Sequence, residues 1–403
     1  MKILQVHNFY QQAGGEDRVL AAEEFLLSSR GHSVLQYTLH NDAVGGMSTL
    51  QLGSRTIWNR QTYRDIRRLI AAERIELVHV HNTLPLVSPA VYWAASSLRV
   101  PVVQTLHNYR LLCPAATFYR AGAVCELCLH KAIKVPAIVH HCYRASAAAS
   151  TAITTMLAAH QVCGTYAKKI DTYIALTEFA RNKFVEGGLP ADRIKVKPNF
   201  LQDDPGLGNG DGGFALFAGR LTEEKGIAHL LDAWEKSRCS IPLRIAGYGP
   251  LQRYVGERVA AMANAEYLGA CDQGRLTALL KQAAFLVFPS RWYEGMPMIV
   301  LEALACGTPV VAFGLGSMND LIVEGVNGTK LAVEKAGALL DFLNNPANVP
   351  NMASLRITAR AHFEQHFTAD LNYELLINIY QEALSKPRSI SLLMKNEMVR
   401  RDE

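Results

Sequence analysis

Short apolar segments that end in polar residues alternate with helical segments along most of the chain, and this alternation constrains the fold more than any other feature. The segments "KILQVHNF", "HSVLQYTL", "IELVHVHN" and "VPVVQTLHN" each have the length of one strand, and helical segments such as "RVLAAEEFLLSSRG" lie between them. Strands that alternate with helices form a parallel sheet covered on both faces. The sequence therefore predicts an α/β protein.

The alternation occurs twice. Residues 201–213, "LQDDPGLGNGDGG", are the stretch richest in Gly and Asp, and the pattern begins again after them with "FALFAGR". A chain of 403 residues also exceeds what one hydrophobic core usually organises. We therefore expect two doubly wound domains, 1–200 and 214–367, joined by a linker at 201–213. Residues 368–403 should form a helix that packs back towards the N-terminal domain, followed by a charged tail.

The charge and hydropathy of the chain limit its location and partners. The net charge of +5 favours an anionic ligand or surface, and we predict no nucleic-acid partner. No apolar run reaches the roughly 18 residues of a membrane span, and "MKILQVHNFYQQ" turns polar too early for a signal peptide. These features predict a cytoplasmic protein whose eight cysteines are mostly reduced.

One basic segment, residues 58–74, places four arginines at helical intervals and leaves Ile66, Leu69 and Ile70 for an apolar side. Such a helix can rest on an anionic membrane surface, so peripheral contact with the inner membrane face is one interpretation. A solvated helix face is the ordinary alternative.

Two cations lie in a loop that leads into a helix. In "AGRLTEEKGI", Arg220 follows a strand, and Lys225 comes five residues later at the mouth of the helix. A guanidinium, an ammonium and free helix amides together suit a diphosphate. The alternative is two exposed basic residues on a turn.

A second loop, "IAGYGP", carries Gly247 and Gly249 directly after a strand. Glycines at such a position permit the close approach of a ligand to the backbone. The dinucleotide fingerprint GxGxxG is absent because Gln252 occupies the place of its third glycine. An ordinary turn is the alternative.

Two glutamates separated by seven residues lie in the otherwise core-like stretch "EGMPMIVLEALACGTPVVAF". Pro297 suits the first position of a helix, which places Glu294 in the preceding loop and Glu302 in the second turn. Glu302 can accept hydrogen bonds from ribose hydroxyls, and Glu294 with the amides of Gly295 and Met296 can hold a second polyhydroxylated group. The alternative for Glu302 is an ion pair with a buried cation.

Polar residues follow two strands of the first half. His81 and Asn82 end one strand, and His107 and Asn108 end the next. Ligands of such sheets bind at the carboxyl ends of strands, so these residues are candidates for the site. A histidine that simply caps a strand is the ordinary reading of His107.

Taken together, these motifs resemble those of the family 4 glycosyltransferases, which have the GT-B architecture of two Rossmann-like domains facing a central cleft. The resemblance rests on "GGE" (14–16), "TLHNYRLLCP", "GRLTEEKG", "AGYGP" and, most specifically, the two glutamates within "FPSRWYEGMPMIVLEALACGTPVV". It implies retaining transfer of a sugar from a nucleotide diphosphate sugar to a glycan or lipid-linked acceptor, in polysaccharide or surface-glycan biosynthesis. No cofactor is implied for the chemistry.

The resemblance also implies individual roles in the C-terminal domain. Arg220 and Lys225 would bind the diphosphate and stabilise its developing charge. Glu302 would bind the ribose and Glu294 the transferred sugar. The implied donor site comprises Gly15, Arg220, Lys225, Gly247, Glu294, Gly295, Met296, Pro297 and Glu302, and the implied catalytic residues are His107, Glu294, Arg220 and Lys225.

In the N-terminal domain, the resemblance implies that Gly15 approaches the phosphates and that His107 lies beside the anomeric carbon. One departure is visible: Asp320 stands where the family more often has glutamate, near the donor. Two other functions stay open, a GT-B sugar-nucleotide epimerase and a non-catalytic sugar-nucleotide-binding subunit. The two glutamates in their sequence context argue against the epimerase.

A group of cysteines follows "RLLCP", and a subset of these glycosyltransferases carries a similar Cys-rich insertion here, at about residues 113–142. The group consists of Cys113, Cys125, Cys128 and Cys142. A CxxC flanked by two further cysteines can hold structural zinc, with His140 or His141 as substitutes. Free core thiols and disulfides are the alternatives.

Overall fold

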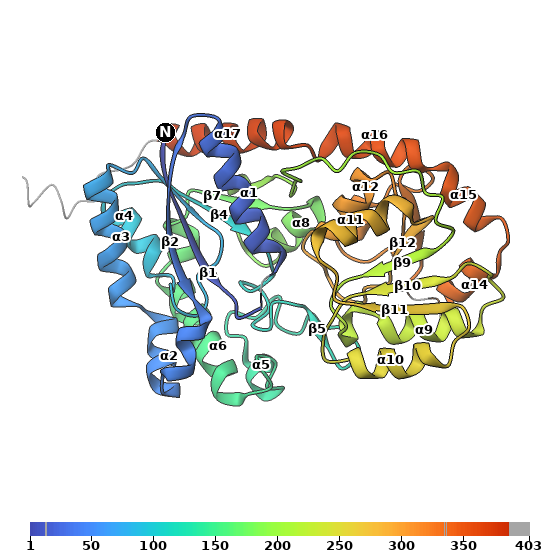
Figure 1. The fold of residues 1–403 in the computed structure, drawn as a ribbon. Coiled ribbons are helices and arrows are strands. Elements are labelled where there is room, and N and C mark those ends of the chain that lie inside the picture. Colours follow the sequence, from blue (N-terminus) through green and yellow to red (C-terminus); the bar gives the residue numbers. More distant parts are fainter. Residues whose placement is uncertain (13, 334, 336, 387–403) are drawn as a thin grey trace, which may run out of the picture.

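The computed structural model describes residues 1–12, 14–333, 335 and 337–386, and it consists of two lobes side by side (Figure 1). Each lobe contains a six-stranded sheet whose pairs are all parallel, with helices packed around it. The predicted class of two doubly wound α/β domains is therefore confirmed. The charged tail expected at the end of the chain lies outside the described residues.

The N-terminal sheet has the strand order β2-β1-β3-β4-β7-β8. Its strands are β1 (Lys2–Phe9), β2 (Ser33–His40), β3 (Leu77–Val80), β4 (Val102–Leu106), β7 (Thr172–Ala175) and β8 (Ile194–Val196), and a small hairpin joins β5 (Tyr119–Arg120) to β6 (Ala123–Val124). The helices are α1 (Gly15–Ser29), α2 (Thr49–Ile57), α3 (Arg60–Glu73), α4 (Ala90–Ser97), α5 (Val135–Val139), α6 (Ala147–Val162), α7 (Thr165–Lys168) and α8 (Glu178–Glu186).

The register of the central strands aligns their carboxyl ends. Val80 at the end of β3 pairs with Val6 on one side and with Gln104 of β4 on the other. The residues that follow β3 and β4 therefore emerge at the same edge of the sheet. This edge faces the C-terminal domain.

The C-terminal sheet has the strand order β11-β10-β9-β12-β13-β14. Its strands are β9 (Ala215–Ala218), β10 (Leu243–Ala246), β11 (Ala265–Gly269), β12 (Phe285–Phe288), β13 (Val310–Phe313) and β14 (Gly328–Leu331). Its helices are α9 (Ile227–Lys236), α10 (Gln252–Ala260), α11 (Gln273–Gln282), α12 (Met298–Ala305), α13 (Met318–Leu321), α14 (Ala338–Asn344), α15 (Asn348–Ser354) and α16 (Arg356–His366).

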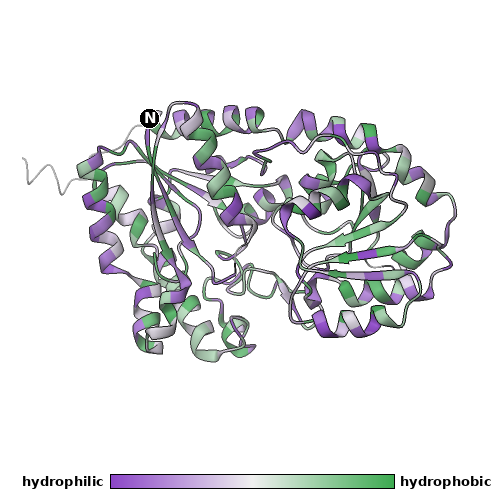
Figure 2. Ribbon diagram, viewed as in Figure 1, coloured by the Kyte–Doolittle hydropathy of each residue, from purple (hydrophilic) through white to green (hydrophobic). Residues whose placement is uncertain are grey.

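The sixth strand, β14, was missed by the sequence reading, which treated β13 as the last. Its sequence, "GTKL", contains no apolar run, and three of its four residues are partly exposed. An edge strand is paired on one side only, so it needs no continuous apolar sequence. Figure 2 shows that the inner strands of this sheet are mostly hydrophobic, while the surrounding helices alternate between apolar and polar residues.

Residues 201–213, expected as a linker, contain no helix or strand, yet they are not a free tether. The amide of Gly208 donates to the Cys306 carbonyl at 2.9 Å, and the amide of Gly210 donates to the Lys281 carbonyl at 2.9 Å. A Cβ on Gly208 would lie only 2.3 Å from that Lys281 oxygen. Glycine is therefore required here because the segment packs tightly on the C-terminal domain.

The chain returns to the N-terminal domain at its end. Helix α16 packs on the C-terminal domain, and α17 (Ala369–Ser385) packs on the N-terminal domain. The two helices run along the same side of the molecule (Figure 1). Leu376 and Tyr380 of α17 are fully buried against Ile3 and Val103 of the N-terminal sheet. This helix therefore belongs to the N-terminal core.

The basic segment forms α3, and its arginines lie on a solvated helix face, as in the ordinary alternative. Ile66 and Ile70 are buried in the N-terminal core, so the apolar side is already covered by protein. The arginines on the other side are exposed. Within the described part of the chain, no helix has both the length and the apolar character needed to cross a membrane.

Candidate active site

Helix α12 places Glu302 at the boundary between the two domains. Pro297 is the extended residue before the helix, and Glu302 follows in the second turn with only 4% of its surface exposed. A buried carboxylate needs compensating donors. Its Oε1 accepts from Arg18 Nη2 at 2.5 Å and from Gln273 Nε2 at 3.2 Å. Because Arg18 belongs to α1, Glu302 forms an ion pair across the domain boundary.

The loop before α12 holds Glu294, which is also buried. Its Oε1 accepts three hydrogen bonds, from Lys225 Nζ at 2.7 Å, Ser290 Oγ at 2.5 Å and Trp292 Nε1 at 2.6 Å. The Lys225 ammonium also lies 5.4 Å from the centre of the Trp292 ring. Two separately predicted residues, Glu294 and Lys225, are therefore direct partners.

Arg220 follows β9 and is exposed at the same boundary. Its Nη2 donates to Gln12 Oε1 of the N-terminal domain at 3.1 Å. Gln12 and Arg18 flank Gly15, and a Cβ on Gly15 would lie 3.5 Å from the side chain of the first residue of α12. Gln12 and the first turn of α1 therefore meet Arg220, α12 and Glu302 at the domain boundary.

Two unpaired backbone amides directly precede α12. In the described part of the chain, the amides of Gly295 and Met296 make no hydrogen bond. A Cβ on Gly295 would lie 2.6 Å from the carbonyl oxygen of His107, and Tyr109 Oη donates to the Glu294 carbonyl at 3.3 Å. The carboxyl end of β4 therefore abuts the loop that carries Glu294.

His107 follows β4 directly, as the sequence indicated, and it contacts the residue that follows β3. His81 Nδ1 lies 2.9 Å from His107 Nε2, and the two rings are stacked. Burial lowers the pKa of His107 to about 3, so its imidazole is neutral at physiological pH. A cavity of about 50 Å³ adjoins these rings and is lined by Asn82 and Asn108 as well.

The structure gives Gly247 and Gly249 a packing role. A Cβ on Gly247 would lie 1.9 Å from the Gly219 carbonyl oxygen, and one on Gly249 would lie 2.7 Å from the Leu221 carbonyl oxygen. Both glycines have φ near +155°. Glycine is required at these positions because the loop packs tightly on its neighbour, and the approach of a ligand to Gly247 stays a prediction.

Asp320 binds protein on the other side of the domain boundary. Its Oδ2 accepts from the amide of Phe179 at 2.6 Å, in the first turn of α8. Thr177 Oγ1 and Ser317 Oγ lie 2.9 Å apart next to it. A carboxylate at a helix amino end is well placed by charge, so Asp320 helps to join the domains.

The four cysteines of residues 113–142 converge on one small cavity, which His140 also lines. All four are free thiols. Burial, with a smaller effect from Cys113, raises the pKa of Cys128 to about 11. Within the described chain, however, these sulfurs are not part of any group of three ligand atoms within 4.8 Å of one another. Tetrahedral zinc holds its sulfurs about 3.8 Å apart, so a metal would have to draw them closer.

Several residues of the site were not found from the sequence. Arg18 is 284 positions from Glu302, and no local pattern connects the two. Glu16 lay within the quoted "GGE", but its environment was not visible: burial, followed by the charge of Asp17, raises its pKa to about 8. Glu23 sits mid-helix in α1 and carries no motif at all.

Family profiles match both halves of the chain. Residues 14–204 match the profile described as Glycosyltransferase Family 4. Residues 213–345 match the profile described as Glycosyl transferases group 1. The boundary between the two matches falls in the segment that separates the two sheets.

Curated relatives match over part of their length. An uncharacterized glycosyltransferase of Methanocaldococcus jannaschii is 27% identical over 43% of this chain and 50% of its own. Glycogen synthase of Mycobacterium tuberculosis is 29% identical over 40% of this chain and 39% of its own. O-antigen chain mannosyltransferase C of Escherichia coli is 28% identical over 42% of this chain and 47% of its own. The matches thus span half or less of these relatives.

Solved structures match the whole fold. Anabaena HepE, in complex with UDP and glucose, has a TM-score of 0.65 at 17% identity and covers 95% of this chain and 100% of its own. The lipopolysaccharide outer core galactosyltransferase WaaB has a TM-score of 0.64 at 15% identity and covers 95% and 99%. At these identities the likeness establishes the fold. With the two profile matches, it shows that the chain belongs to the family 4 glycosyltransferases of the GT-B fold.

Proposed function

We propose that this glycosyltransferase moves a sugar, with retention of anomeric configuration, from a nucleotide diphosphate sugar to a hydroxyl of a glycan or lipid-linked acceptor. The main support is that the predicted residues all lie at the domain boundary: Arg220 contacts Gln12 and Glu302 contacts Arg18, while Lys225 pairs with Glu294, whose loop abuts the end of β4. Two carboxylates, two cations and free amides suit the parts of such a donor. Synthesis of a polysaccharide or surface glycan follows from such an acceptor.

In donor binding, groups of the donor would replace the protein partners that Glu294, Lys225 and Glu302 have in this structure. The diphosphate would take the Lys225 ammonium and the Arg220 guanidinium, together with the amides of Gly295 and Met296 at the start of α12. Glu294 would then be free to accept from hydroxyls of the sugar. Glu302, released from Arg18, would accept from the ribose.

The chemical step needs charge stabilisation at the diphosphate. The bond between the anomeric carbon and the phosphate oxygen breaks, and the acceptor oxygen forms its bond on the same face. The acceptor proton passes to the departing phosphate oxygen. Lys225, Arg220 and the amides before α12 stabilise the charge that develops there. His107 is neutral, so it acts as a hydrogen-bonding group beside the anomeric carbon and not as an acid.

The acceptor would bind on the N-terminal side. The cavity at the ends of β3 and β4 is lined by Asn82, Asn108 and Arg110, which can hydrogen-bond to hydroxyl groups. Glu16 lies beside it, since Asn82 Nδ2 is 3.4 Å from Glu16 Oε1. Its raised pKa keeps Glu16 protonated and uncharged near neutral pH.

The test is a donor screen followed by a transfer assay. UDP, GDP and ADP sugars are first ranked by thermal shift, starting with UDP-glucose because the structurally similar HepE is seen with UDP and glucose. Nucleotide release is then measured with and without glycan acceptors, and NMR of the product gives its anomeric configuration. We expect slow release without acceptor, faster release with it, and a retained anomer.

Other outcomes identify the other functions. Donor binding with no nucleotide release from any donor would indicate a non-catalytic binding subunit. Release accompanied by an epimerised sugar, with no transfer product, would indicate an epimerase. A product with inverted anomeric configuration would contradict the retaining mechanism but not the proposed sugar transfer.

We also propose that the four cysteines bind a structural zinc ion, which would order the loop beside the acceptor. Support comes from their convergence on one cavity and from Lys134, whose buried ammonium donates to the Cys128 carbonyl at 2.8 Å and offsets thiolate charge. Metal analysis of the purified protein should find one zinc per chain. C125S and C128S should lose it, whereas C163S, a change at an exposed cysteine elsewhere, should keep it. A metal-free unmodified protein would contradict the proposal.

A further inference from the structure

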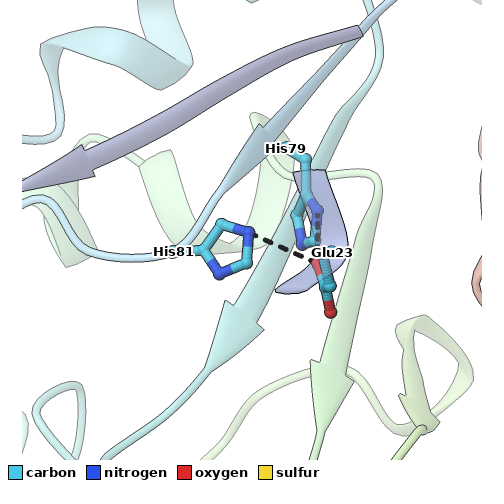
Figure 3. A group of neighbouring side chains, drawn as sticks. All are labelled: Glu23, His79 and His81. Atoms are coloured by element: carbon cyan, nitrogen blue, oxygen red, sulfur yellow. Dashed lines mark ion pairs between the residues drawn. The ribbon is translucent and has the colours of Figure 1, made fainter. Parts of the chain in front are cut away.

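Figure 3 shows a buried polar cluster made of Glu23, His79 and His81. Glu23 of α1 is fully enclosed, and its Oε2 lies 3.5 Å from His79 Nδ1 and 3.5 Å from His81 Nε2. Its other oxygen accepts from Lys197 Nζ at 2.9 Å, and Lys197 is fully enclosed as well. His81 then contacts His107 at 2.9 Å. A continuous chain of polar contacts thus connects Lys197 with His107.

Two histidines and a glutamate in this arrangement resemble a metal site, but the charge balance excludes a metal ion. The Lys197 ammonium already supplies the positive charge that Glu23 needs. Burial alone would raise the pKa of Glu23, but the Lys197 ammonium lowers it overall, so the carboxylate is ionised. A divalent cation would face the ammonium at close range without screening by water.

The contacts of His81 with Glu23 and His107 indicate which ring nitrogens carry the protons. Burial lowers the pKa of His79 and His81 well below the usual value, so both rings are neutral. Glu23 Oε2 and His81 Nε2 are both buried, and among the described residues neither has a hydrogen-bond partner; they face each other at 3.5 Å, which is a charge contact and not a hydrogen bond. Because an ionised carboxylate favours an N–H over a lone pair beside it, His81 carries its proton on Nε2. His81 Nδ1 is therefore an acceptor, and His107 Nε2 must donate to it.

His79 differs from His81 although both adjoin Glu23. Tyr380 Oη of α17 lies 2.8 Å from His79 Nδ1, and Thr105 Oγ1 lies 2.8 Å from His79 Nε2. Both nitrogens of His79 thus have hydroxyl partners within the core. Among the described residues, His79 makes no hydrogen bond to His107. Of the two histidines beside Glu23, only His81 therefore connects Glu23 with His107.

We propose that His81 is a positioning residue, held by Glu23, that accepts the Nε2 proton of His107 and so leaves the Nδ1 lone pair of His107 to accept from a substrate hydroxyl. Among the described residues, no hydrogen bond engages His107 Nδ1. Turning the ring to present its other nitrogen would break the His107 Nε2 contact with His81 Nδ1, so this contact holds the ring in its orientation. The inference rests on the proposed function, since it assumes that His107 contacts the substrate.

The first test compares two leucine variants at matched positions. H81L and H79L each remove a fully buried imidazole that lies 3.5 Å from Glu23. We expect H81L to lower kcat about 10- to 100-fold with donor KM nearly unchanged, because small misplacement of a site group has effects of this size. H79L should leave kcat close to that of the unmodified protein. H81N, whose amide oxygen can replace Nδ1 as acceptor, should recover part of the loss.

Equal losses of kcat in H81L and H79L would overturn the proposal, because they would indicate a general structural effect. So would an H81L variant with unchanged kcat.

The second test does not depend on turnover. Long-range proton–nitrogen NMR of protein labelled with nitrogen-15 histidine should show His81 and His107 protonated at Nε2, with the His107 signals assigned by H107Q. A proton on Nδ1 of His107 would overturn the proposal. Absence of any sugar transfer by the unmodified protein would instead contradict the proposed function.

Discussion

The two domains have the same kind of fold but hold their carboxylates in opposite ways. In the N-terminal domain, Glu23 and its cation Lys197 are both completely enclosed. In the C-terminal domain, Glu302 and Glu294 are buried, but the cations that pair with them reach solvent. The side chain of Arg18 is 47% exposed and that of Lys225 is 17% exposed.

This difference separates a fixed part of the site from an exchangeable part. An enclosed ion pair cannot lose one partner without leaving an unpaired charge in the core, so it holds His81 and His107 in one geometry. A partly exposed cation can leave its carboxylate for a phosphate, because water and ligand compensate the change. The C-terminal carboxylates can therefore bind and release a donor.

The largest expected effect comes from breaking the enclosed pair. K197M would leave Glu23 ionised and unpaired in the core, which should destabilise the protein by about 3 to 5 kcal/mol. Urea unfolding followed by circular dichroism measures the change. K197M combined with E23Q should recover much of the loss. A loss below about 1 kcal/mol for K197M alone would show that the pair is not truly enclosed.

An intermediate effect, on donor affinity, is expected from replacing Lys225, the partly exposed cation that pairs with Glu294. K225A should weaken donor binding about 10- to 100-fold, because a hydrogen bond to a charged group contributes about 1.5 to 3 kcal/mol. Isothermal titration with the donor found in the screen measures it. K236A, a change at an exposed lysine of α9 in the same domain, serves as the control. Equal donor affinity in K225A and K236A would remove Lys225 from the site.

A pH effect is expected from Glu16. Its pKa is raised to about 8, so the folded state binds a proton that the unfolded state releases above its ordinary value of 4.5. Stability should therefore fall as pH rises between 4.5 and 8, by at most about 1.4 kcal/mol per pH unit. E16Q has no carboxyl group to titrate at this position. The free energy of unfolding of E16Q, relative to that of the unmodified protein, should therefore rise from pH 5 to pH 8. Parallel urea-unfolding profiles of the two proteins would contradict the assignment.

The smallest effect is expected from the ion pair across the domains. Arg18 is about half exposed, so R18A should change stability by less than about 1 kcal/mol. Donor affinity should stay equal or increase slightly, because Glu302 is then free for the ribose. A clear decrease in affinity, measured by the same titration, would show that Arg18 itself binds the donor.

The sequence predicted those features that local patterns encode. The alternation of strands and helices gave both sheets, and Pro297 placed Glu294 and Glu302 on the correct sides of the start of α12. The edge strand β14 was missed because its four residues carry no apolar run. The tight contact of Gly247 with Gly219 could not be told from the sequence, because it needs the same residue as contact with a ligand.

Pairings between distant residues were beyond any local pattern. Nothing near Arg18 indicates that it meets Glu302, and nothing near Glu23 indicates that Lys197 lies beside it. Such contacts depend on how two domains and a returning helix pack together. The same limit applies to His81, which was seen as a strand-end residue while its contact with His107 was not.

The most direct test of the account is the crystal structure of the protein with its nucleotide diphosphate sugar. We predict diphosphate oxygens within about 3.2 Å of Lys225 Nζ and the Arg220 guanidinium, with the Lys225–Glu294 contact opened and Glu294 facing the sugar. A donor bound elsewhere, with the Lys225–Glu294 and Arg18–Glu302 pairs both intact, would contradict it.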